Sequence, residues 1–257
     1  MNIVSPPSRE LLRLVTRVDF ATGRLAAARP AALNTEWEAP RHAWCLSNLV
    51  LRHEDAVLTL ARTDQVLVPA AWGAARAAME IAGRALWLTM PEDPWVRERR
   101  WLVFVDEAAR FHDRMATDAN SGHEEAKGIS TFAAEVRAKL PPGDPVHGIP
   151  STTEMLTPYG KGLPALYALC SQYVHGADAA VSQWRRGLGN TAAYGEQVKS
   201  WEFATPIMIA WQAFRATAVT LMRVCGVRAG FDLALLEGQI SAARDDLEAT
   251  RLTRDNS

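Results

Sequence analysis

The 257-residue sequence has almost no net charge, few cysteines and no continuous apolar leader. Its 28 basic and 29 acidic side chains leave a net charge of −1, so the whole chain has no positive field to attract nucleic acid or membrane surfaces non-specifically. Cys45, Cys170 and Cys225 are an odd number with wide spacing, which is typical of reduced thiols buried as small apolar side chains. We expect a cytoplasmic protein.

The most apolar segment, residues 203–226, is long enough to raise the question of a membrane span. Polar and charged residues interrupt it, among them Gln212, Arg215 and Arg223. The segment is therefore predicted to be a buried core helix, and no membrane partner is expected.

Apolar residues recur three and four positions apart along most of the chain, a spacing typical of helices, and no strand pattern is present. Without repeats, low-complexity tracts or a linker, the sequence predicts an all-α fold: one multi-helix bundle of about seven to nine helices in a single domain, 1–257. The expected helices are 8–30, 40–61, 69–89, 94–115, 130–140, 163–187, 196–224 and 232–252.

A turn, a long loop and the C-terminal tail lie outside these helices. The short Pro-bounded turn after residue 89 predicts an antiparallel hairpin of helices 69–89 and 94–115. Residues 141–162 form a long Pro/Gly-rich loop, either a lid, an interface arm or a flexible insertion, in which Ser151 and Glu154 have capping-box spacing. The polar tail 253–257 is expected to be disordered.

Helix 69–89 is apolar nearly all round, apart from one charged stripe. Arg76, Glu80 and Arg84 follow one another at intervals of four residues, and Trp72 and Trp87 project from the same side. The stripe is either an exposed edge with ordinary ion pairs or an inward-facing polar site flanked by indole rings. The two tryptophans favour the polar site, because indoles are poor choices for a solvated edge.

The helix predicted over 163–187 offers a partner for this stripe. Tyr167, Ser171, His175 and Asp178 fall on one of its faces. His175 could act as a general base, with Asp178 or Glu80 orienting its second ring nitrogen. The alternative is a structural histidine that is hydrogen-bonded between helices.

Metal and cofactor sites are not supported by the motifs. His-Glu-Asp at 53–55 and His-Glu-Glu at 123–125 lack the second histidine of a zinc protease motif, and the cysteines lack paired spacing. Glycine-rich nucleotide fingerprints are also missing. We therefore expect no metal and no cofactor.

The order of motifs over residues 66–180 resembles an uncharacterised group of bacterial all-helical proteins. Four features carry the resemblance: Ala75-Arg76 with Glu80, Trp87-Leu88 before Pro91, Arg97 with Arg100, and Ser171 with His175. That group is similar in outline to HEPN proteins, many of which are RNases of toxin–antitoxin and phage-defence systems. HEPN nucleases carry an arginine four to six residues ahead of a histidine; here Cys170 occupies that position, so the standard motif is missing unless Arg76 replaces it.

The sequence thus leaves two functions open. The first is a HEPN-like effector, RNA-targeting or of the defence or toxin type, in which His175 is the acid or base, Arg76 stabilises negative charge and Glu80 completes the catalytic trio. The second is a non-catalytic module that binds a small ligand or a partner protein. The resemblance also raises the prospect of a homodimer. Candidate binding residues are Trp72, Arg84, Trp87, Ser171, Tyr167 and Asp178.

Overall fold

A computed structural model describes residues 5–29, 35–116, 120–181, 185–186, 193–194 and 199–254, with side chains masked at 120–121, 178–179, 185–186, 193–194 and 252–254. The predicted all-α bundle is confirmed. Its helices are α1 (Arg9–Ala28), α2 (Glu38–Thr63), α3 (Val68–Thr89), α4 (Pro94–Met115), α5 (Asn120–Lys139), α6 (Thr152–Leu156), α7 (Leu163–Val174), α8 (Asp178–Val181), α9 (Ala204–Val224) and α10 (Leu233–Arg254). The 3₁₀ turns η2 (Gln65–Leu67), η3 (Thr157–Tyr159) and η5 (Ser200–Phe203) link them.

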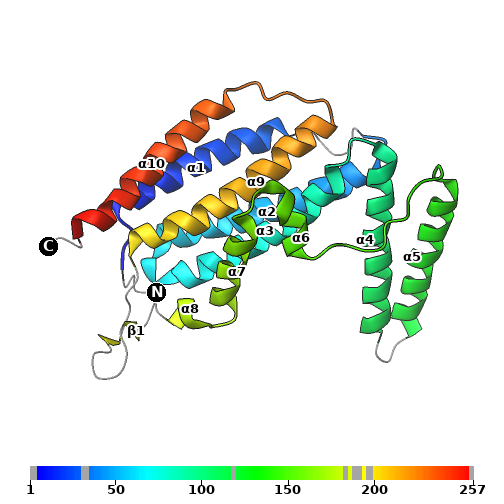
Figure 1. Cartoon of the computed structure of the whole chain (residues 1–257), viewed down its shortest axis with the longest axis horizontal. Helices are drawn as coiled ribbons and strands as arrows, with labels where there is room; N and C mark the ends of the chain where they lie inside the picture. The colour runs from blue at the N-terminus through cyan, green and yellow to red at the C-terminus, as the bar shows by residue number, and fades with distance from the viewer. Residues whose placement is uncertain are drawn as a thin grey trace.

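Helix α9 is the centre of the bundle and contacts α1, α2 and α3 (Figure 1). Trp211 and Phe214 on α9 are completely buried, as are Leu11 and Leu14 on the facing side of α1. The prediction that this segment forms a buried core helix is therefore confirmed. Over the described residues, no helix combines the length and the apolar character needed to cross a membrane.

Helices α4 and α5 pack mainly on each other at one end of the bundle, where α4 crosses the end of α3 (Figure 1). The prediction that α4 packs along α3 as an antiparallel hairpin is therefore wrong. Trp101 and Phe104 of α4 instead form a second apolar cluster with Ala133 of α5, and only the last turn of α3, at Leu88, takes part in it. Helix α5 also begins ten residues before the predicted residue 130, at Asn120. Polar composition concealed this first half of the helix.

The helix predicted over 163–187 ends early, at Val174. Gly176 adopts a positive φ of 64°, and the Ala177 amide donates to the Gln172 carbonyl at 2.9 Å, the bond that closes a Schellman motif. Glycine adopts this left-handed conformation without steric cost, so it stops the helix here. Beyond α8, the two-residue strands β1 (Arg185–Arg186) and β2 (Ala193–Tyr194) pair antiparallel, which the sequence did not predict.

The segment 141–162 is not loop throughout. The predicted capping box is confirmed: Ser151 Oγ accepts the Glu154 amide at 3.3 Å, and Glu154 Oε2 accepts the Ser151 amide at 2.8 Å. Helix α6 follows and buries Met155 and Leu156. At the other end of the chain, α10 continues to Arg254, so the predicted disordered tail begins inside a helix and its last residues, 255–257, are outside the described part.

Only one of the three cysteines matches the predicted burial. Cys170 is buried, whereas Cys45 is exposed and Cys225 half-buried, and all three are free. Cys45 lies on the exposed side of its helix, so apolar neighbours in the sequence were not sufficient to predict its burial.

Glu54 is a buried carboxyl in the interface of α2 with α1. Its side chain is 0% exposed and accepts one hydrogen bond, from Thr22 Oγ1 at 2.7 Å. The second oxygen, Oε2, is buried without a hydrogen-bond partner among the described residues. Burial raises the pKa of Glu54 well above its ordinary value.

We therefore expect Glu54→Gln to change how stability depends on pH. The native state keeps a proton that the unfolded chain loses near pH 4.3, so the wild-type free energy of unfolding falls as pH rises toward the folded pKa. The uncharged variant lacks this fall. Relative to wild type, it should gain about 1 kcal/mol or more between pH 5 and pH 8 in urea unfolding. Parallel pH profiles of the two proteins would contradict the prediction.

Candidate functional site

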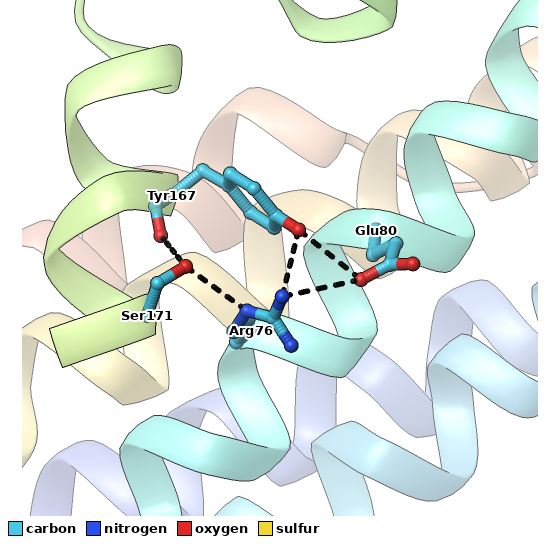
Figure 2. A network of polar contacts seen from close by, with 4 residues as sticks. All are labelled: Arg76, Glu80, Tyr167 and Ser171. Atoms are coloured by element: carbon cyan, nitrogen blue, oxygen red, sulfur yellow. Dashed lines mark hydrogen bonds and ion pairs between the residues drawn. The ribbon is translucent and has the colours of Figure 1, made fainter. Parts of the chain in front are cut away.

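Arg76 of α3 and Glu80, one turn later, meet two side chains of α7 (Figure 2). Arg76 Nη2 donates to Tyr167 Oη at 2.9 Å, and Arg76 Nε donates to Ser171 Oγ at 3.0 Å. The Tyr167 hydroxyl donates in turn to Glu80 Oε2 at 3.3 Å, while Arg76 Nη2 lies 3.9 Å from the same oxygen. Ser171 Oγ completes the chain by donating to the Tyr167 carbonyl at 2.9 Å.

The spacing explains why these groups meet. Arg76 and Glu80 on α3, like Tyr167 and Ser171 on α7, are four residues apart and so share one face of their helix. The Arg76 and Glu80 side chains are 25% and 34% exposed, and the Arg76 guanidinium also lies over the Tyr167 ring at 5.1 Å. The stripe thus faces a neighbouring helix, and its hydrogen bonds attach α7 to α3.

His175 takes no part in this network. It is the C-cap residue of α7, its side chain is exposed, and within the described chain it forms no hydrogen bond or ion pair with Arg76 or Glu80. Its backbone amide donates to the Ser171 carbonyl at 3.0 Å. The side chain of Asp178, the predicted orienting partner, is outside the described residues.

The other predicted binding residues have separate neighbours. Trp72 is 5% exposed and stacks on Tyr173 of α7, with ring centroids 4.7 Å apart. Arg84 pairs with Glu107 of α4 at 3.2 Å. The Trp87 ring lies under the Arg100 guanidinium, 4.9 Å from it. The stripe therefore bridges α3 to α7 at one end and to α4 at the other.

A cavity of about 290 Å³ adjoins the network on the next face of α3. Sequence reasoning did not identify it. Apolar side chains from four helices make up most of its wall: Met79, Ala82, Leu86, Leu156, Leu163, Leu166, Met208, Ile209, Ala213 and Ala216. Polar groups line it at few positions, namely Tyr159, Thr205, Gln212, Arg244 and Glu248.

No family model matches this chain, and no curated protein or solved structure matches it either.

The network and the cavity share their walls. Tyr167 bonds to Arg76, while the preceding Leu166 lines the cavity, and on α3 Met79 and Ala82 line it on either side of Glu80. Attaching α7 to α3 thus also sets the position of one cavity wall. Among the described residues, no three His, Cys, Asp or Glu side chains gather as metal ligands would.

One sequence signal pointed toward the cavity. Alanines at 82, 213 and 216 face one another from α3 and α9, and alanine fills little space between helices. A second signal is that α3 is apolar nearly all round, so the face beside its charged stripe must be covered by another helix. Which helix covers it could be found only from the tertiary structure.

We expect Arg76→Gln to loosen α7 specifically. The substitution removes two hydrogen bonds of a charged donor and should lower the free energy of unfolding by about 1–3 kcal/mol. Hydrogen exchange should speed up in α7 more than in α1.

Arg13→Gln is the matched control, because Arg13 pairs with Asp246 on an exposed surface, with side chains 46% and 56% exposed. Such pairs contribute about 0–1 kcal/mol. Equal losses in the two variants, with uniform exchange, would show that the network does not hold α7.

Proposed function

We propose that this chain is a non-catalytic helical module that binds a small, mainly apolar molecule in the cavity between α3, α7 and α9. The observation that supports this function is the cavity itself: its volume of about 290 Å³ is close to the lower end of small-molecule sites, about 300–1,000 Å³. Its wall is apolar with a few polar positions, which is the usual composition of such sites.

A packing defect is a poor explanation for a space of this size. Protein interiors are packed as densely as organic crystals and contain few voids larger than a water molecule. Here the space is bordered by Gln212, an exposed residue, and by Arg244, whose side chain is 36% exposed. A ligand therefore has a route from solvent and polar groups near the entrance that would orient it.

Several contacts favour binding over RNA cleavage. Arg76, which would have to replace the missing nuclease arginine, already donates from Nε and Nη2 to Ser171 and Tyr167. His175 is exposed one turn beyond Ser171 and, among the described residues, forms no hydrogen bond with Arg76. The recognition surface also differs from the Trp72 stripe that the sequence suggested, because Trp72 is covered by Tyr173.

Filling the cavity should abolish binding of an apolar probe. N-phenyl-1-naphthylamine, a neutral dye that fluoresces in apolar surroundings, should bind the wild-type chain with a saturable rise in fluorescence. Ala216→Phe places a ring in the cavity and should weaken binding at least about tenfold, because the ring occupies the apolar volume that the dye needs.

Ala138→Phe is the control, since residue 138 is exposed on α5, away from the cavity. Equal binding by the wild type and both variants would place the dye elsewhere. No saturable binding to the wild type would refute the proposed function.

A second experiment addresses RNA cleavage directly. Incubation of the purified chain with end-labelled RNA should give no cleavage that depends on His175, so wild type and His175→Ala should produce the same pattern. Cleavage that is present in the wild type and lost in the variant would contradict a non-catalytic role and favour the HEPN-like alternative.

A further inference from the structure

The two ends of the cavity differ in the charges around them. At one end, Arg244 of α10 is neutralised: its Nη2 lies 2.7 Å from Asp245 Oδ1, and its Nε lies 3.8 Å from Glu248 Oε1. At the other end, Tyr159 and Leu86 line the wall. Arg100 reaches this second end, because it donates to the carbonyl of Trp87, the residue after Leu86.

Arg223 belongs to the same end. It follows Ala216, a cavity residue, by two turns of α9, and residues seven apart share a helix face. The positive charges of Arg100 and Arg223 both lower the pKa of the Tyr159 phenol, against the larger effect of burial, so both charges act on this end of the cavity. The α4 helix that carries Arg100 crosses the ends of the bundle here (Figure 1).

These cations have no carboxylate counter-charge. Over the described residues, neither Arg100 nor Arg223 lies within 4.0 Å of an Asp or Glu oxygen. Glu98, a buried acid on α4, instead accepts the Ala39 amide at 2.8 Å. Arg100 is half-buried, whereas Arg223 is exposed. A half-buried arginine without a counter-ion, such as Arg100, is a ready site for a carboxylate or phosphate, since its guanidinium keeps unused donors, and Arg223 adds a second positive charge at this end.

We infer that the ligand of the cavity is an amphipathic anion: a medium-length aliphatic chain in the apolar space, with its carboxylate at the Tyr159 end beside Arg100 and Arg223. This inference rests on the proposed function and adds the chemistry and the direction of the ligand. From Ala204 to Ala216 the cavity follows α9 over twelve residue steps, about 18 Å at 1.5 Å per residue, which suits a chain of medium length.

Tyr159 suits the same head group. Burial raises the pKa of its phenol to about 12, so the hydroxyl keeps its proton at neutral pH and can donate to a carboxylate. The opposite orientation is disfavoured, because Glu248 at the Arg244 end would face the carboxylate with a like charge.

The test compares decanoate with decanol as competitors of N-phenyl-1-naphthylamine at pH 7.5, below the concentrations at which either aggregates. Decanoate should displace the dye at concentrations about tenfold lower than decanol, because charge-assisted hydrogen bonds to the two arginines are available only to the anion. In Arg100→Gln/Arg223→Gln the two competitors should become equivalent, while decanol displaces the dye as in wild type.

Arg99→Gln/Arg110→Gln removes two charges from the same end of the molecule and should keep the preference for decanoate. A preference that survives in Arg100→Gln/Arg223→Gln, or decanol binding as tightly as decanoate to wild type, overturns the anionic ligand but leaves the proposed function intact. Failure of the dye itself to bind refutes the proposed function instead, so the two failures are distinguishable.

Discussion

The attachment of α7 to α3 through the Arg76 guanidinium is the interaction on which the rest of the site depends. Helix α7 has 12 residues, a length at which isolated helices are marginal in water, and Cys170 is its one fully buried residue. Its other apolar contacts are partial, since Leu163, Leu166, Tyr167 and Tyr173 pack against the core without being fully buried. Hydrogen bonds from Arg76 to Tyr167 and Ser171, on successive turns, add a directional constraint on both the position and the rotation of α7.

The rotation of α7 determines what the neighbouring face does. With Tyr167 turned toward Arg76, Leu163 and Leu166 line the cavity opposite α9, whose part of the wall combines Met208 and Ile209 with the small Ala213 and Ala216. The same pair of helices thus carries a hydrogen-bonded polar contact on one face and an unfilled apolar space on the next. Because the wall is held by directional bonds and not by side chains that fill the space, the space can persist without collapse of α7 onto α9.

Local sequence signals predicted the elements well where the chain itself determines them. Helix α1 begins directly after Ser8, which caps it by accepting the Leu11 amide at 3.2 Å, and α4 spans Pro94–Met115 as expected. The four-residue spacing of Arg76 and Glu80 correctly implied a shared face. These features depend on neighbours a turn away, so they can be seen in one sequence.

The predictions that failed extended a helical pattern beyond the point where the helix ends, or concerned features that no single segment determines. His175 was assigned to the face of Tyr167 and Ser171 on the assumption that the helix continues, but the chain turns at Gly176 and His175 is the cap residue. The cavity was missed for a different reason: it exists only where α3, α7 and α9 come together, and no single segment encodes it. Tertiary contacts of this kind leave only indirect signals, such as facing alanines.

The net charge of the chain likewise does not show which partners its individual arginines have. A net charge of −1 argues against an anion site, yet it says nothing of how each arginine is occupied. Arg76 donates to two neutral hydroxyls and lies 3.9 Å from the Glu80 carboxylate, and Arg244 is neutralised by two acids. Arg100 instead donates to a backbone carbonyl, which satisfies one donor and leaves its charge uncompensated. Because burial makes such a charge costly, an arginine of this third kind is where a bound anion gains most, and it lies beside the cavity.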